Sequence, residues 1–444
     1  MKYRFLAAML AFWVGASTYA QNNAAPVVPW IKQGNVYEVN VRQYTPEGTF
    51  NAFAKHLPRL KAMGVQTLWF MPITPISVKD RKGHLGSYYA VANYTQVSPE
   101  FGTLTDWKAL VKQCHALGFK VIIDWVANHT GADNPWLTKH PQFFKRDAAG
   151  NAMVAYDWTD TRKLDYANAE LADSMIAAMK YWVTETGIDG FRCDVAMEVP
   201  ASFWSKCIKT LQQTKPLFML AEGDDAWLHE AGFNASYCWE YFAMSKRVAM
   251  HERPAFALDS VLTKYKNTYP ANFMKLYFTS NHDENSWNKA DYATMPGAIH
   301  APFGVLTFTL PNSLPLIYSG QEEPVADSIS FFYKDAIPFK NYNRAPFYQK
   351  LIQLRNSIPA LAYDANGYKV GLADGKDNVV YAFVREAGNS KVLVVVNLSR
   401  RPQTITLVDK AIRGKATEMF SNKVVDFSAS KLTVEPWGYQ VYKF

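Results

Sequence analysis

A regular alternation of short apolar runs with amphipathic stretches is the strongest structural signal in this 444-residue chain. The apolar runs predict eight strands, and most of the stretches between them have the periodicity of helices. The eight predicted strands are Val36–Val41, Val65–Met71, Val121–Asp124, Gly190–Val195, Leu217–Ala221, Ala235–Trp239, Lys275–Thr279 and Pro315–Tyr318. Because eight consecutive right-handed βαβ units favour closure over an open sheet, the pattern predicts an α/β fold built on a (β/α)₈ TIM barrel.

Two interruptions of this alternation predict the domain organisation. Polar and aromatic residues replace the pattern over about 131–168, which predicts a short insertion after the third strand, here called the B region. After Ile358, short β-like runs separated by turn residues occur without a helical stripe. We therefore expect a catalytic barrel over residues 21–362, which includes the B region, and a C-terminal antiparallel β-sandwich domain over residues 363–444.

The N-terminus has the pattern of an export signal. Lys2 and Arg4 form a basic segment, Phe5–Val14 is apolar, and small residues lead to Ala20. The alternative, a membrane anchor, is disfavoured because about 20 apolar residues are needed to span a bilayer. We expect residues 1–20 to be a signal peptide and the mature chain to be periplasmic or extracellular.

Charge and cysteine content exclude several other classes of protein. The formal net charge is +8, but the basic residues are scattered, with no basic run beyond Arg400–Arg401. This distribution disfavours nucleic acid and membrane surfaces as partners. The spacing of the four cysteines matches neither a small disulfide scaffold nor a zinc site, so we expect free, buried thiols.

Charged residues occur where the predicted barrel strands end, which is where (β/α)₈ enzymes place their working groups. Asp194, Glu222 and Asp283 follow the fourth, fifth and seventh strands, and Arg192 lies two residues before Asp194. A single Asp at a strand end is usually a helix cap or turn former, and Asp124 fits that description. Three carboxylates and an arginine at one rim favour a functional site, because charged groups near a barrel core need partners.

Three carboxylates without a cysteine or histidine metal cluster suit the hydrolysis of glycosides. One carboxylate attacks the anomeric carbon and another protonates the leaving oxygen. If Asp194 and Glu222 form such a retaining pair, their carboxyl groups should lie about 5–5.5 Å apart. The aromatic rings proposed to stack on sugar faces are those of Tyr89, Trp158, Trp227 and Trp287.

Several segments resemble the sequence signatures of the α-amylase family of retaining glycosidases, glycoside hydrolase family 13. The principal matches are Asp124–His129, Gly190–Asp194, Glu222 with its neighbours, and Phe278–Asp283. Further matches are Gly86–Val91, Phe101–Thr103 and Leu314–Gly320, and the terminal β region resembles the C-terminal domain of the family. The resemblance implies an α-glucan substrate, with Asp194 as the nucleophile, Glu222 as the general acid/base and Asp283 as the third carboxylate.

The same resemblance implies roles for the residues around the carboxylates. Arg192 would hold Asp194 ionised and oriented. His129 and His282 match histidines that bind the hydroxyls of the sugar at the cleavage point, and Tyr89 matches the aromatic platform beneath it.

One departure from the family concerns calcium. Members that bind structural calcium tend to place an Asp where this chain has Lys163, and an ammonium group cannot ligate a cation. Asn128 matches the other usual calcium ligand. With Lys163 nearby, no metal site or cofactor is firm, and a calcium ion at Asn128 is the disfavoured alternative.

A second departure leaves the subgroup open. Many α-amylases have Lys-His three and four residues after the nucleophile, and this chain has Met197 and Glu198. The segment Asp194–Val199 resembles the cyclomaltodextrinase and neopullulanase pattern, but only about 15 residues precede the first strand of the mature chain, too few for the N-terminal domain those enzymes share. We expect an α-1,4-glucan hydrolase acting on starch or maltooligosaccharides. The alternatives are a cyclomaltodextrinase-like, neopullulanase-like or transglycosylating enzyme and, from a different class, a non-catalytic glucan-binding protein.

Overall fold

The computed structural model describes residues 28–289, 295–325, 327–409, 411–429 and 431–444. The predicted signal peptide lies outside these residues. Eight parallel strands close into a barrel in the order β1-β10-β9-β8-β7-β6-β3-β2, which confirms the predicted fold class. The barrel strands are β1 (Val36–Val39), β2 (Thr67–Phe70), β3 (Lys120–Val126), β6 (Gly190–Asp194), β7 (Phe218–Ala221), β8 (Ala235–Tyr237), β9 (Lys275–Tyr277) and β10 (Ser313–Tyr318).

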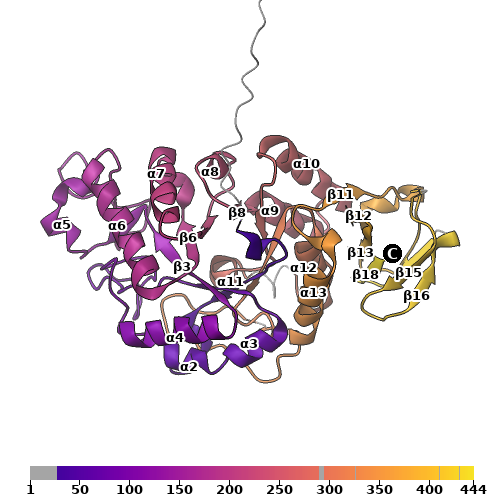
Figure 1. Cartoon of the computed structure of the whole chain (residues 1–444), viewed down its shortest axis with the longest axis horizontal. Helices are drawn as coiled ribbons and strands as arrows, with labels where there is room; N and C mark the ends of the chain where they lie inside the picture. The colour runs from indigo at the N-terminus through magenta and orange to yellow at the C-terminus, as the bar shows by residue number, and fades with distance from the viewer. Residues whose placement is uncertain (1–27, 290–294, 326, 410, 430) are drawn as a thin grey trace, which may run out of the picture.

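Helices surround the barrel strands (Figure 1). They are α1 (Val41–Tyr44), α2 (Phe50–Ala54), α3 (Leu57–Met63), α4 (Leu104–Ala116), α6 (Ala169–Thr186), α7 (Ala201–Gln212), α8 (Trp227–Glu230), α9 (Trp239–Ala249), α10 (Leu258–Thr268), α11 (His282–Asn288), α12 (His300–Thr309) and α13 (Ala345–Ser357). Local sequence sets their ends. The Thr103 side chain accepts from the backbone N–H of Asp106, whose carboxylate accepts from Thr103 in return, so α4 begins with a capping box. Gly64 ends α3 with φ +95°, a conformation that favours glycine.

The B region contains little regular structure. Its two strands, β4 (His129–Gly131) and β5 (Thr161–Lys163), pair antiparallel with His129 opposite Lys163. Between them lie the one-turn helix α5 (Trp136–Lys139) and a short 3₁₀ turn at Pro141–Phe143. The insertion therefore leaves the barrel after β3 and returns beside its point of departure.

The chain after α13 forms two antiparallel sheets. One has six strands in the order β11-β12-β13-β18-β15-β16, and the other pairs β14 with β17. Their bounds are β11 (Asn366–Lys369), β12 (Val380–Ala387), β13 (Ser390–Asn397), β14 (Gln403–Thr406), β15 (Lys415–Glu418), β16 (Val424–Asp426), β17 (Lys431–Val434) and β18 (Tyr439–Lys443). In Figure 1 this β region lies at one end of the molecule, against α12 and α13. The sequence predicted strands here at Val379–Val384, Lys391–Asn397, Thr404–Val408 and Tyr439–Tyr442, and it missed β11 and β15–β17, which have only three or four residues each.

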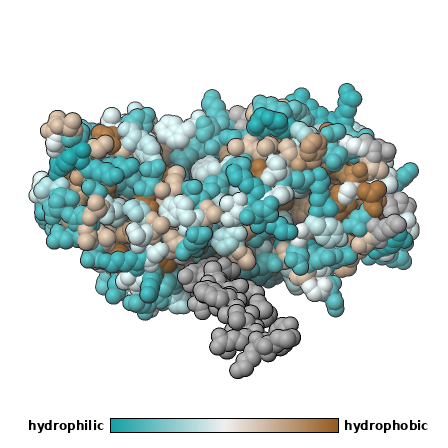
Figure 2. Space-filling model, turned by 90° about the horizontal axis from the view of Figure 1, so that it is seen from above, coloured by the Kyte–Doolittle hydropathy of each residue, from teal (hydrophilic) through white to brown (hydrophobic). Residues whose placement is uncertain are grey.

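The barrel and its helices enclose one large hydrophobic core, and a smaller core lies within the C-terminal sheets. All four cysteines are buried and free, as expected. Figure 2 shows a largely hydrophilic face, with a group of hydrophobic side chains toward the end that carries the C-terminal strands. Among the described residues, no helix has both the length and the apolar character needed to span a bilayer.

Candidate active site

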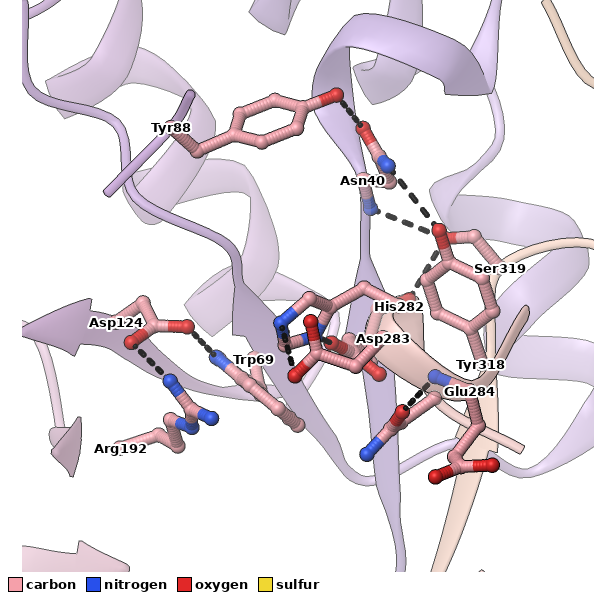
Figure 3. A network of polar contacts seen from close by, with 12 residues as sticks. Asn40, Trp69, Tyr88, Asp124, Arg192, His282, Asp283, Glu284, Tyr318 and Ser319 are labelled. Atoms are coloured by element: carbon pink, nitrogen blue, oxygen red, sulfur yellow. Dashed lines mark hydrogen bonds and ion pairs between the residues drawn. The ribbon is translucent and has the colours of Figure 1, made fainter. Parts of the chain in front are cut away.

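The guanidinium of Arg192, on β6, holds three carboxylates at the C-terminal rim of the barrel. Its Nη1 lies 2.9 Å from Asp124 Oδ1 and 3.0 Å from Asp194 Oδ1, and its Nη2 lies 3.0 Å from Glu222 Oε2. Arg192 is fully buried, and Figure 3 shows its side chain directed at Asp124. Because residues two apart on a strand point to the same face, β6 presents Arg192 and Asp194 together, as the sequence predicted.

The backbone after β6 connects Asp194 with Glu222. Val195 adopts the left-handed conformation with φ +35°, which is strained for a β-branched residue. Its N–H donates to Glu222 Oε2 at 2.7 Å, and the N–H of Ala196 donates to the carbonyl of Glu222. The two carboxylates are therefore fixed relative to each other by the backbone as well as by Arg192.

The proton balance of the site is set by burial and by this crowding of charge. Burial and the neighbouring Glu222 raise the pKa of Asp194 well above its ordinary value, while Arg192 opposes that rise. Arg192 therefore favours the ionised form of Asp194 against the effects of burial and of Glu222.

A second polar group surrounds His282, at the start of α11. Its Nδ1 lies 2.5 Å from Glu38 Oε1, and its Nε2 lies 3.3 Å from Asp283 Oδ2 and 2.8 Å from the hydroxyl of Tyr89. Burial alone would lower the pKa of His282, but Asp283 and Glu38 raise it well above its ordinary value. Figure 3 shows His282 beside Asp283, and with Glu38 on its other nitrogen the ring is an imidazolium held between two carboxylates.

Asp124 connects the two groups. Its Oδ2 accepts from Trp69 Nε1 at 3.2 Å and from the Tyr89 hydroxyl at 3.0 Å, while its Oδ1 faces Arg192. Asp124 is thus neither a helix cap nor a turn former, as a lone Asp at a strand end usually is. It is a buried charge partner that orients Arg192 and Tyr89.

His129 presents an unpartnered nitrogen at the site. Its ring is buried, and its Nε2 has no hydrogen-bond partner among the described residues. Burial lowers the pKa of His129 to about 3, so the imidazole is neutral at ordinary pH. A buried polar atom without a partner is costly, and a ligand hydroxyl at Nε2 would relieve that cost.

These side chains line one cavity of about 340 Å³, near the lower end of the size range of ligand pockets. Its lining includes Tyr89, His129, Trp158, Asp194, Glu222, His282, Asp283 and Trp287. Trp227 is not part of the lining. The chain turns away after Glu222 and enters the one-turn helix α8, which begins at Trp227.

The cavity also contains residues that sequence reasoning did not select. They are Lys82, Ser87, Asp160, Thr161, Val195, Phe331 and Phe332. Most of them come from irregular loops, where no periodic sequence pattern indicates the direction in which a side chain points. Glu38, the partner of His282, lies inside the apolar run of β1, so the charge within that run was the only available signal.

The side chains relevant to calcium do not fit that ion. Lys163 Nζ lies 3.3 Å from Glu198 Oε2, and the Asn128 amide lies 3.3 Å from His129 Nδ1. An ammonium already paired with a carboxylate leaves cationic charge where a metal would need anionic oxygen ligands. Among the described residues there is no cluster of three or more His, Cys, Asp or Glu side chains that suits a metal ion.

The closed parallel barrel carries three cavity-facing carboxylates, a buried arginine and aromatic walls at its C-terminal rim. This combination defines the class of (β/α)₈ glycoside hydrolases. A sequence model described as the α-amylase catalytic domain matches residues 27–153, and one described as the α-amylase SusG C-terminal domain matches residues 380–438. The chain belongs to the α-amylase family of glycoside hydrolases, enzymes that cleave O-glycosyl bonds.

The similarity extends over nearly the whole chain. A noncanonic maltogenic α-amylase, AmyB from Thermotoga neapolitana, is 29% identical and has a TM-score of 0.85, with 94% of this chain and 99% of that one covered. Neopullulanase 2 from Thermoactinomyces vulgaris is 28% identical, with 81% of this chain and 64% of that protein covered. Alpha-amylase MalA from Haloarcula japonica is 24% identical, with 85% of this chain and 57% of that protein covered. The chain thus spans less than two thirds of either curated relative.

Proposed function

We propose that this protein is a retaining α-glucan hydrolase that cleaves α-1,4-glucosidic bonds in starch or maltooligosaccharides. The observation that carries the proposal is the position of Asp194 and Glu222, which face one buried arginine and line the same cavity as Asp283. A nucleophile and a proton donor that share one positive partner suit a double displacement. Membership of the α-amylase family supports the choice of substrate.

In the first half-reaction, Glu222 gives its proton to the glycosidic oxygen. A carboxylate oxygen of Asp194 attacks the anomeric carbon, the bond from that carbon to the glycosidic oxygen breaks, and the shortened glucan leaves as an alcohol. The sugar is then held as an ester on Asp194. Loss of its proton to the leaving group leaves Glu222 as a carboxylate beside the Asp194 ester, and the charge of Arg192 stabilises that carboxylate.

In the second half-reaction, the Glu222 carboxylate takes a proton from water. The water oxygen attacks the anomeric carbon, the ester bond breaks, and Asp194 is released as a carboxylate. Two inversions at the same carbon retain the α configuration. The cycle ends with Glu222 protonated again, ready for the next substrate.

The surrounding groups would hold the sugar at the point of cleavage. Asp283 and the His282 imidazolium offer an acceptor and a charged donor to neighbouring hydroxyls, and neutral His129 offers Nε2. Tyr89 provides an aromatic face fixed by its hydrogen bond to Asp124. Positioned in this way, the groups orient the anomeric carbon toward Asp194.

A second candidate is a cyclomaltodextrinase-like, neopullulanase-like or transglycosylating enzyme. It is favoured by Met197 and Glu198, which follow the nucleophile where many α-amylases have Lys-His, and by the similarity to neopullulanase 2. In the transglycosylating variant, a sugar hydroxyl replaces water in the second half-reaction. A non-catalytic glucan-binding role is disfavoured, since all three carboxylates are present in the cavity.

The test is to incubate the purified mature chain with soluble starch, pullulan and cyclodextrins and to identify the products. Rapid loss of starch supports the first candidate, and preference for cyclodextrins or pullulan supports the second. New longer oligosaccharides at high substrate concentration indicate transglycosylation. Asp194→Asn should abolish activity without changing the thermal unfolding midpoint, and full activity in that variant would exclude Asp194 as the nucleophile.

We also propose export of the protein. The basic, apolar and small-residue segments over residues 1–20 support cleavage near Ala20 and release to the periplasm or the exterior. N-terminal sequencing of the protein recovered from cell fractions tests this. A first residue near Gln21 outside the cytoplasm is the expected result, and an uncleaved cytoplasmic chain would contradict it.

A further inference from the structure

Asp224 is a charged residue two positions after the general acid/base, and it has no part in the mechanism above. Glu222 lines the cavity, whereas Asp224 does not. Gly223, between them, has φ +152°, a conformation that residues other than glycine rarely adopt. The chain therefore turns sharply after Glu222 and directs the Asp224 side chain away from the cavity, toward β9 and α10.

Four groups hold the carboxylate of Asp224. Lys275 Nζ lies 2.5 Å from Oδ1, and the hydroxyl of Tyr269 donates to the same oxygen at 3.0 Å. The Tyr265 hydroxyl and the backbone N–H of Glu240 donate to Oδ2 at 2.9 Å and 2.8 Å. These partners belong to β9, to α10 and the residue that follows it, and to α9. Three elements of the barrel are therefore tied to the loop that carries Asp224.

The ion pair with Lys275 has a fixed geometry. Lys275 is fully buried, and its ammonium also donates to Ser236 Oγ and to the carbonyl of Tyr237, both at 3.0 Å. The same ammonium lies 3.7 Å from the centre of the Tyr269 ring. Burial lowers the pKa of Lys275 to about 8, although Asp224 opposes the fall, so the lysine keeps its proton at neutral pH. All three N–H donors of the ammonium are used, which restricts it to one position.

The backbone connects this anchor to Glu222. The carbonyl of Glu222 accepts from the N–H of Ala196. On the other side of Gly223, the Tyr269 hydroxyl donates to the carbonyl of Asp224 at 2.6 Å. Because glycine is conformationally permissive, the chain at Gly223 is held by the residues that flank it. A general acid must lie within hydrogen-bond reach of the atom that it protonates, and an error of about 1 Å can cost about a hundredfold in rate.

We propose that Asp224 is a positioning residue for Glu222, held in place by Lys275 and Tyr269. Asp224 does not line the cavity, so it acts only through Glu222. By fixing the turn after Glu222, it holds the carboxyl group where its proton reaches the glycosidic oxygen. The inference rests on the proposed function and deepens it, because it adds a residue on which the transfer of that proton depends.

Two substrates that differ in their need for the acid test this directly. Cleavage of maltotetraose releases a sugar alcohol and needs the proton of Glu222, whereas fluoride leaves α-maltosyl fluoride without one. For both substrates kcat/KM reports the steps up to departure of the leaving group, so slow hydrolysis of the ester does not affect it. The measured quantity is the ratio of kcat/KM for α-maltosyl fluoride to kcat/KM for maltotetraose. Partial loss of folded protein lowers both values equally and leaves this ratio unchanged.

The decisive variants are Asp224→Asn, which keeps the size of the side chain but removes its charge, and Tyr269→Phe, which removes one hydroxyl. Asp225→Asn is the control for the first, since Asp225 is exposed and outside the cavity lining. Tyr241→Phe is the control for the second, since the buried Tyr241 hydroxyl has no hydrogen-bond partner among the described residues. Glu222→Gln sets the upper limit of the ratio, because it lacks the acid.

The expected result is a rise in the ratio for both decisive variants, because the acid is displaced while the nucleophile on β6 is not. Asp224→Asn should raise the ratio at least about tenfold over its control, and Tyr269→Phe at least about threefold. The rise should come from kcat/KM for maltotetraose. Should Asp224→Asn fail to fold, Tyr269→Phe decides alone.

Two other outcomes have distinct meanings. A wild type that hydrolyses both substrates, together with a folded decisive variant whose ratio stays within about twofold of its control, would overturn the positioning role and leave the proposed function standing. A wild type that hydrolyses neither substrate would contradict the proposed function itself, and the positioning role with it.

Discussion

Glu38 Oε1 lies 2.5 Å from His282 Nδ1, although the two residues are 244 positions apart in the sequence. Both side chains are buried, and β1 and β9 reach the same rim from opposite sides of β10. Because Glu38 fixes one nitrogen of the ring, the other nitrogen is directed at Asp283 and Tyr89. Glu38 therefore acts on the substrate through His282.

The first prediction concerns Glu38→Gln. Removal of the carboxylate lowers the pKa of His282, because Glu38 is one of the two anions that raise it. The imidazolium then loses its proton at lower pH, so the alkaline limb of the kcat/KM profile should move to lower pH. We expect a loss of about 1.5–3 kcal/mol in transition-state stabilisation, or tenfold to a hundredfold in kcat/KM. A pH–rate profile checks this, and an unchanged alkaline limb would contradict the role of Glu38.

The second prediction concerns Arg192→Lys. Lysine keeps the positive charge but lacks the planar fork that reaches Asp124, Asp194 and Glu222 together. We expect kcat to fall at least about a hundredfold, since at least one buried carboxylate loses its partner at a cost of about 3–5 kcal/mol. Steady-state kinetics with circular dichroism as a folding control measures this. Activity within tenfold of the wild type would show that charge alone suffices.

The third prediction is a pH dependence of stability that comes from His229, remote from the chemistry. Burial lowers the pKa of His229 to about 3, so below about pH 6.5 the unfolded chain binds a proton at this residue that the folded chain does not. Stability is therefore lost as pH falls from 6.5 toward 3. His229→Gln, which can still hydrogen-bond Ser236, removes this pH-dependent contribution to the free energy of unfolding. Between pH 6.5 and 5, urea unfolding should show the wild type losing about 2 kcal/mol more than the variant. Parallel losses would contradict the buried neutral state.

The fourth prediction concerns the contact between the barrel and the C-terminal sheets. Buried Arg385, on β12, donates to five carbonyls, among them those of Thr309 and Leu310 at the end of α12. Arg385→Met leaves these acceptors without their donor. We expect a loss of at least about 3 kcal/mol in the free energy of unfolding, because each unsatisfied buried acceptor costs about 1–3 kcal/mol. Exposed Arg413→Met is the control. Equal unfolding midpoints for the two variants would contradict this role.

The sequence predicted the barrel because parallel strands buried on both faces appear as compact apolar runs between helical stripes. It predicted Asp194, Glu222 and Asp283 because these residues follow the predicted strands, whose C-terminal ends converge at one rim of the barrel. The C-terminal strands β15 and β16 were missed because four and three residues are too few to show a periodic pattern.

The rest of the site depends on contacts that spacing does not encode. Nothing in the sequence links Glu38 to His282, because barrel closure alone brings them together. Lys82 and Asp160 lie in loops without periodicity, so the direction of their side chains follows only from the ion pairs that brace those loops. A stacking role for Trp227 was inferred from residue type, and the cavity does not include it.

The most direct test of the central claim is to trap the covalent intermediate. In Glu222→Gln, α-maltosyl fluoride still forms the ester, because fluoride leaves without a proton, but hydrolysis is slow because the base is missing. Mass spectrometry of the intact protein followed by peptide mapping should find one maltosyl group on Asp194. A label on another residue, or no label while the donor is consumed to give β-maltose as the first product, would contradict a retaining mechanism through Asp194.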